Sequence, residues 1–213
     1  MTSEIKTLLV ISAVTIVVLI IGVAFLSRPP KSPAPTVDAK FLVREDSFKT
    51  ASASAKVTLV EFGDYQCPAC KAAHPSVKQL VKDYADKINF VFRNFPLPQH
   101  KNAQISAEAA EAAGVQGKFW EMHDKLYQNQ NVWSESNQPL VIFTGYAKEL
   151  GLDTAKFQND VSTNKFSEKI NRDQNDANAL EINGTPTFFI NNKRLDGISS
   201  YSDFKNAIDK ELK

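Results

Sequence analysis

The chain has 213 residues, of which 43% are hydrophobic and 23% charged, and these values are typical of a globular domain. They exclude a collagen-like, coiled-coil or disordered chain. The 25 basic and 24 acidic residues leave a net charge of +1, so we expect no nucleic-acid binding, which requires a strongly basic surface. The presence of only two cysteines excludes a small fold held together by several disulfides.

The N-terminal segment is strongly apolar, because residues 8–26 contain no charged side chain. As a helix this run would span roughly 28 Å, close to the hydrocarbon core of about 30 Å. A cleavable signal peptide is the alternative, but Phe25 and Leu26 are poor residues for a cleavage site. We therefore predict that residues 1–26 form a single N-terminal transmembrane helix that is retained as a membrane anchor.

Residues 27–37 connect this segment to the remainder of the chain, and the run SRPPKSPAPT contains four prolines. Proline favours an extended backbone and removes hydrogen-bond donors, so we predict a semi-stiff linker. The folded domain is expected to comprise residues 38–213.

The first elements of this domain are expected to be a strand, a helix and a strand. Residues 57–62 are rich in β-branched and apolar side chains, and residues 88–92 repeat this pattern. Between them, residues 68–84 place apolar side chains at helical spacing. A β-α-β order of this kind predicts a parallel pair of strands.

The middle of the domain is expected to be helical, because residues 103–182 show little strand pattern. Five helices are predicted there, and Asp153 is a plausible N-cap for the fourth. Strands return at residues 187–190 and 193–195 as a hairpin, and Ser200 begins a final helix with a capping box. The fold class is therefore α/β, with a small sheet interrupted by an all-helical insertion.

The chemistry is expected at Cys67-Pro68-Ala69-Cys70, where a strand leads into a helix. This spacing allows the two sulfurs to form a disulfide, and the positive end of the helix stabilises a Cys67 thiolate. Pro68 suits the first helical position, which needs no backbone N–H. A C-x-x-C sequence near a β-α-β pattern is typical of thioredoxin-like redox proteins.

A metal site is the main alternative interpretation of the two cysteines. His74 lies on the same expected helix as Cys67 and Cys70, so the three side chains are candidate ligands of a zinc- or copper-binding module. A closed zinc site normally needs four ligands, so we expect no metal and no other cofactor. Haem attachment is excluded because Lys71, not histidine, follows the second cysteine. His74 itself, which precedes Pro75, is expected to lie on the surface of a kinked helix.

Three segments together resemble the DsbA-like thiol–disulfide oxidoreductases: Glu61-Phe62, the C-x-x-C sequence, and Gly184-Thr185-Pro186-Thr187-Phe188. The resemblance covers residues 41–213, and the anchor is similar to that of membrane-tethered members. It implies a thioredoxin-like fold with an inserted helical block at about residues 103–182.

The resemblance also implies roles for individual residues. Cys67 matches the exposed nucleophile and Cys70 its buried partner, while Pro186 matches a proline that follows a cis peptide bond and faces the disulfide. Thr185 is expected to offer its backbone to the substrate, next to Pro68 and Ala69 of the motif. Glu61 matches a buried proton acceptor, although an ordinary strand-end glutamate in a salt bridge is an equal alternative. The family often has histidine at the position of Ala69, and that possible stabiliser of the thiolate is missing here.

These observations predict a membrane-anchored oxidase that acts on substrate proteins with free thiols at the extracytoplasmic side of the cell membrane. The resemblance implies re-oxidation by a quinone-linked membrane protein, and we expect a monomer. The alternatives are a reductase or isomerase of the same fold, the metal-binding module, and a tethered chaperone or adaptor that uses only the fold.

Overall fold

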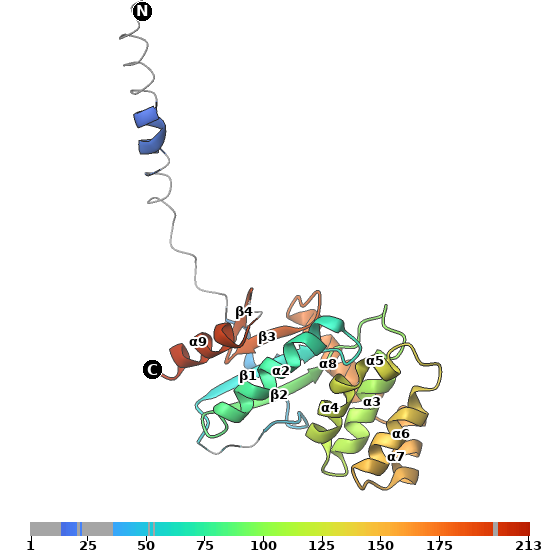
Figure 1. Cartoon of the computed structure of the whole chain (residues 1–213). Helices are drawn as coiled ribbons and strands as arrows, with labels where there is room; N and C mark the ends of the chain where they lie inside the picture. The colour runs from blue at the N-terminus through green and yellow to red at the C-terminus, as the bar shows by residue number, and fades with distance from the viewer. Residues whose placement is uncertain (1–13, 21, 23–35, 51, 53, 198–199) are drawn as a thin grey trace, which may run out of the picture. The chain divides into compact units, whose positions relative to one another are not determined.

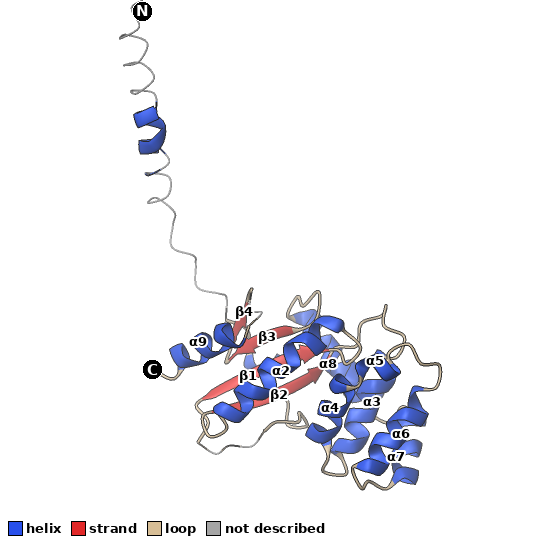
Figure 2. Cartoon of the chain, viewed as in Figure 1, coloured by secondary structure: helices blue, strands red, loops and turns tan. Residues whose placement is uncertain are grey.

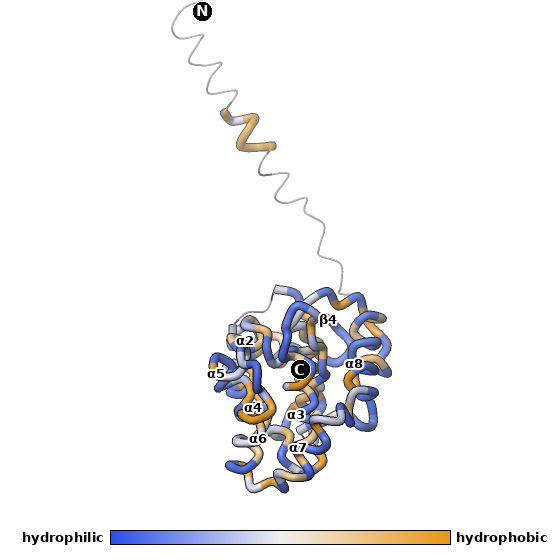
Figure 3. The backbone as a smooth tube through the Cα atoms, turned by 90° about the vertical axis from the view of Figure 1, so that its right-hand side faces the viewer, coloured by the Kyte–Doolittle hydropathy of each residue, from blue (hydrophilic) through white to orange (hydrophobic). Residues whose placement is uncertain are grey.

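The structure is a computed structural model that describes residues 14–20, 22, 36–50, 52, 54–197 and 200–213. The chain divides into two compact units, residues 1–34 and 35–213. In the first unit, residues 14–20 are helical and hydrophobic (Figure 3). In the part of the chain that the structure describes, no helix has both the length and the apolar character needed to cross a bilayer. The predicted anchor at residues 8–26 and the linker at 27–37 lie mostly outside the described residues.

The second unit is a mixed α/β domain (Figure 1). Its elements in chain order are η1 (Ala39–Phe41), β1 (Val57–Gly63), α2 (Pro68–Asp83), β2 (Ile88–Asn94), α3 (Ala103–Gly114), α4 (Phe119–Gln128), α5 (Gln130–Trp133), α6 (Pro139–Glu149), α7 (Thr154–Ser162), α8 (Ser167–Ala179), β3 (Thr187–Ile190), β4 (Lys193–Leu195) and α9 (Tyr201–Glu211).

The four strands form one sheet in the order β2-β1-β3-β4 (Figure 2). β1 and β2 are parallel, with Val57 opposite Ile88, which confirms the predicted β-α-β unit. β3 runs antiparallel to β1, with Glu61 opposite Phe188, and pairs with β4 as the predicted hairpin. β1 is an inner strand of the sheet. The loop that follows it therefore begins between β2 and β3, at the end of the sheet where β1 finishes.

The sheet is covered on both faces, which explains why its strands are almost continuously apolar. Leu59 and Phe90 belong to a large core shared with α2, α9 and the inserted helices. Val60 and Phe189 face the opposite way, into a smaller core with Leu42 and the end of α8. This alternation places Glu61, the next residue of β1, on the same face as Leu59 and therefore beneath α2.

Helices α3 to α8 form the predicted all-helical insertion between β2 and β3. Its core is aromatic, with Trp133, Phe143 and Phe157 fully buried. The short helix α5 was not predicted, because residues 130–133 continue the polar end of α4 without a clear start signal. It is held by the Trp133 side chain, whose Nε1 donates a hydrogen bond to the carbonyl of Leu126 at 2.8 Å.

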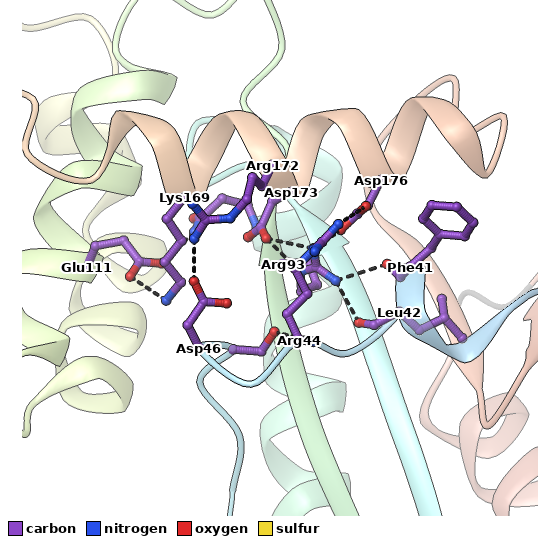
Figure 4. Close-up of polar contacts among 12 residues, drawn as sticks. Phe41, Leu42, Arg44, Asp46, Arg93, Glu111, Lys169, Arg172, Asp173 and Asp176 are labelled. Atoms are coloured by element: carbon purple, nitrogen blue, oxygen red, sulfur yellow. Dashed lines mark hydrogen bonds and ion pairs between the residues drawn. The ribbon is translucent and has the colours of Figure 1, made fainter.

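A buried ionic network joins α8 to the sheet and to the segment before β1 (Figure 4). At its centre is Arg93 of β2, which is 0% exposed. Its guanidinium donates to Asp173 at 2.8 Å and to Asp176 at 2.6 Å, both on α8. It also donates to the carbonyls of Phe41 and Leu42, each at 2.9 Å. No local sequence pattern predicts this network, which fixes α8 on the sheet.

Candidate active site

The two cysteines lie where β1 leads into α2. Cys67 is the N-cap of α2 and Pro68 is its first residue, as the sequence predicts. Both thiols are reduced in this structure. Cys67 keeps 7% of its surface exposed and Cys70 none, so the nucleophile is less exposed than expected. Pro68 and Ala69 are exposed beside it, so they border the approach to the Cys67 sulfur.

The environment of Cys67 lowers the pKa of its thiol to about 5. The largest cause is a hydrogen bond from the Cys70 thiol, and partial burial opposes it. The side chain of Thr185 and the backbone N–H groups of Cys70 and Ala69 also stabilise the thiolate. At neutral pH Cys67 is therefore ionised, which is the reactive form of a cysteine.

The loop before β3 lies against Cys67. The Thr185–Pro186 peptide bond is cis, and the Thr185 carbonyl oxygen is 3.4 Å from Cys67 Sγ. The Thr185 hydroxyl oxygen is buried and has no other hydrogen-bond partner among the described residues, so the Cys67 thiolate is the acceptor open to it. Thr187 Oγ1 donates to the Gly184 carbonyl at 2.8 Å and holds the loop in place. The loop that resembles the family motif thus lies beside the dithiol, and the roles of its residues stay predictions.

Glu61 and Cys70 form the buried side of the site. Glu61 is 2% exposed, and burial together with the neighbouring Cys67 charge raises the pKa of its carboxyl to about 8. No ion pair to Glu61 is present in the described part of the chain, so the salt-bridge alternative gains no support. Burial also raises the pKa of Cys70 well above its ordinary value, with the Cys67 hydrogen bond and the Glu61 charge adding to this effect. At neutral pH both groups therefore hold their protons.

The loop between β1 and α2 is fixed by two buried polar side chains, those of Asp64 and Gln130. Asp64 is buried and accepts hydrogen bonds from the backbone N–H groups of Gln66 at 2.7 Å and Leu97 at 2.9 Å. Gln130 of α5 donates to the carbonyls of Tyr65 at 2.8 Å and Cys67 at 3.0 Å. The helical insertion therefore holds the backbone of the nucleophile. The position of Asp64 directly after a strand was the only sequence signal for this arrangement.

The structure corrects the expectation for His74. Its side chain is 7% exposed and lies 3.1 Å from Asp124 of α4, because α4 packs against α2 and covers this position. Among the described residues, the group of potential metal ligands that lies together is His74, His123 and Asp124. The cysteines are not part of it. The predicted alternative of one metal site made by Cys67, Cys70 and His74 is therefore not assembled.

The fold and the dithiol at the start of α2 define a thioredoxin-like α/β protein with an inserted helical block. Residues 49–210 match the Thioredoxin family (Thioredoxin_4), and the chain belongs to this family. The match covers both cysteines and the cis-proline loop.

Solved structures are similar over most of the chain. BdbD from Bacillus subtilis in its oxidised form is 24% identical, with a TM-score of 0.72 over 86% of this chain and 99% of that one. A thioredoxin-like oxidoreductase from Silicibacter pomeroyi is 28% identical, with a TM-score of 0.68 over 82% and 97% of the two chains. DsbA2 from Pseudomonas aeruginosa is 26% identical, with a TM-score of 0.60 over 76% and 92%.

The curated relatives are named differently. A Na(+)/H(+) antiporter NhaA 1 from Salinispora arenicola is 42% identical over 144 residues, which are 67% of this chain and 21% of that protein. The chain therefore spans about a fifth of the length of this relative, and the match describes a shared segment only.

Proposed function

We propose that the protein is a thiol–disulfide oxidoreductase that oxidises substrate protein thiols through a Cys67–Cys70 disulfide. The observation that carries this proposal is the Cys67 thiol at the start of α2, whose pKa is lowered to about 5. At pH 7 this stabilises the thiolate by about 2.7 kcal/mol, at about 1.36 kcal/mol per pH unit. Stabilising the thiolate favours the reduced protein and raises the reduction potential by about 60 mV. The Cys67–Cys70 disulfide is therefore a stronger oxidant than one whose cysteines have ordinary pKa values.

The reaction proceeds in two exchanges. A substrate thiolate attacks Cys67 Sγ of the disulfide, a substrate–Cys67 bond forms, and Cys70 leaves and takes up a proton. A second substrate thiolate then attacks the substrate sulfur and expels the Cys67 thiolate. The substrate loses two electrons and gains a disulfide, while the protein gains two electrons and becomes a dithiol. The low pKa of Cys67 makes it the better leaving group in the second exchange.

Glu61 is suited to supply and recover the proton of Cys70. Because the pKa of its carboxyl is raised to about 8, the group is protonated at neutral pH and is able to donate when Cys70 leaves. Re-oxidation needs the reverse transfer, from the Cys70 thiol to an ionised Glu61. The carboxylate form becomes more abundant as the pH rises toward 8.

The proposal places this reaction at the extracytoplasmic side of the cell membrane, where disulfides persist. The apolar run at residues 8–26 supports a single-pass anchor. The chain has no third cysteine to relay electrons, so turnover requires an external oxidant. We propose that this oxidant is a quinone-linked membrane protein. The substrates are proteins that carry free thiols, and the enzyme acts as a monomer.

The test is the equilibrium of the full chain with glutathione, followed by thiol alkylation of Cys67 and Cys70. We expect a potential well above the value of about −270 mV for thioredoxin, and oxidation of a reduced, unfolded protein by the disulfide form. The Cys67→Ser variant should be inactive, whereas Arg172→Gln, at an exposed residue of α8 that pairs with Asp46, should stay active. A potential near that of thioredoxin would favour a reductase instead, and efficient reshuffling of wrong disulfides would favour an isomerase. Activity without Cys67 would exclude all three.

A further inference from the structure

Two imidazoles and a carboxylate lie together where α2 packs on α4. We call His74, His123 and Asp124 the α2–α4 cluster. One potential ligand atom of each residue lies within 4.8 Å of the other two. The histidines are 7% and 3% exposed, and the Asp124 side chain is 30% exposed. The cluster is therefore mostly shielded from water, with one side open to solvent.

His74 has a buried ring nitrogen that the protein satisfies only in part. Its Nε2 is 3.1 Å from Asp124 Oδ1, within the distance of an ion pair. The contact does not have the alignment of a good hydrogen bond, and Nε2 has no other polar partner among the described residues. A buried polar atom that is only partly satisfied is costly. A cation between Nε2 and Oδ1 would satisfy both atoms.

The other two residues are arranged as ligands require. His123 Nδ1 lies 3.1 Å from the Tyr65 hydroxyl, and when Nδ1 donates to this oxygen, Nε2 keeps its lone pair. Asp124 Oδ2 accepts from Lys78 Nζ at 2.5 Å, and this contact leaves Oδ1 for an ion. Lys78 thereby orients the carboxylate.

A cavity of about 140 Å³ borders the cluster and gives access to it. His74, His123 and Asp124 line it together with apolar side chains that include Val77 and Trp120. The cavity leaves room for a water as a further ligand. Metal–nitrogen bonds of about 2.0–2.1 Å place tetrahedral ligand atoms about 3.3 Å apart, so the longest separation must shorten by about 1.5 Å. Binding therefore requires the side chains of His74 and Asp124, which border the cavity, to rotate toward the ion.

We propose that His74, His123 and Asp124 bind one divalent zinc ion, with water completing the coordination, and so connect α2 to α4. Two imidazoles and one carboxylate are a ligand set that zinc accepts. The site does not use the cysteines and is independent of the proposed oxidation reaction. It would fix the helix that carries Cys67 and Cys70 against the helical insertion.

The test uses the full chain with Cys67→Ser and Cys70→Ser, so that no thiol is able to bind metal. We expect calorimetry to show one equivalent of bound Zn²⁺, and Co²⁺ to give a visible absorption spectrum of the tetrahedral type. Zn²⁺ should also raise the melting temperature, because only the folded protein binds the ion. His74→Gln and Asp124→Asn should each weaken Zn²⁺ binding about 100-fold or more. Tyr65→Phe, which removes only the hydroxyl behind His123, should weaken it about tenfold or more.

The matched control is His100→Gln, which replaces the remaining histidine of the chain and should leave Zn²⁺ affinity unchanged. Circular dichroism establishes that each variant is folded. The proposal would be overturned if His74→Gln and Asp124→Asn bound Zn²⁺ as tightly as the parent protein without cysteines. It would also be overturned if that parent bound no metal at millimolar Zn²⁺. Either result leaves the redox proposal intact, because both cysteines are absent from this experiment.

Discussion

The low pKa of Cys67 should depend first on Cys70. The hydrogen bond from the Cys70 thiol is the largest cause that lowers this pKa. The Cys70→Ala variant removes this donor and leaves the backbone N–H groups of residues 69 and 70 in place. It also leaves a single thiol, so that any titration belongs to Cys67.

The size of the effect follows from the strength of the lost bond. A hydrogen bond to a charged group contributes about 1.5–3 kcal/mol, and one pH unit corresponds to about 1.36 kcal/mol. We therefore expect Cys70→Ala to raise the pKa of Cys67 by about one to two pH units. Cys70→Ser is the matched control, because its hydroxyl still donates, and it should keep the pKa of Cys67 close to about 5.

The assay is thiolate absorbance in the ultraviolet as a function of pH, supported by the pH dependence of the iodoacetamide reaction rate. Wild-type protein is measured as the dithiol, in which the pKa of Cys70 is raised well above that of Cys67. If Cys70→Ala left the pKa of Cys67 unchanged, the hydrogen bond would not be the cause. The Thr185 side chain and the backbone N–H groups at the helix N-terminus would then account for the thiolate.

Three further predictions concern stability and proton transfer. Burial raises the pKa of Glu61 to about 8, so the wild-type protein loses stability as the pH rises from about 4.5 to 8. Glu61→Gln should therefore raise the free energy of unfolding at pH 7 by about 2–3 kcal/mol, and it should also slow thiol oxidation. An unchanged stability in urea and an unchanged oxidation rate would refute the two expectations. The Cys67 thiolate, whose pKa is lowered to about 5, stabilises the reduced fold above about pH 5. Between pH 7 and pH 5, the free energy of unfolding in urea should therefore fall by about 2 kcal/mol more for the reduced protein than for the oxidised protein. Equal pH profiles of the two forms would contradict this. Arg93→Met should cost about 3–5 kcal/mol by leaving the buried Asp173 carboxylate without its cation, whereas Arg172→Met, whose side chain is 44% exposed, should cost at most about 1 kcal/mol in the same assay.

The amino-acid sequence determined the order and type of most elements, because their signals are local. Strand residues 57–62 and 187–190 are apolar runs, and the structure confirms both. The capping box of Ser200 and Asp203 also forms as predicted and begins α9. The spacing of Cys67 and Cys70 located the dithiol at the start of a helix.

The tertiary structure decided which distant residues surround that dithiol. Gln130 reaches the Cys67 carbonyl across 63 positions, and Arg93 reaches Asp173 across 80. Contacts between residues so far apart leave no periodic pattern in the sequence. Arginine, aspartate and glutamine lie mostly on protein surfaces, so their residue types do not reveal that they are buried here. His74 was wrongly expected on the surface for the same reason, since only the packing of α4 on α2 buries it. The chain encodes its elements locally, whereas the pKa values of its site depend on burial, which only packing creates.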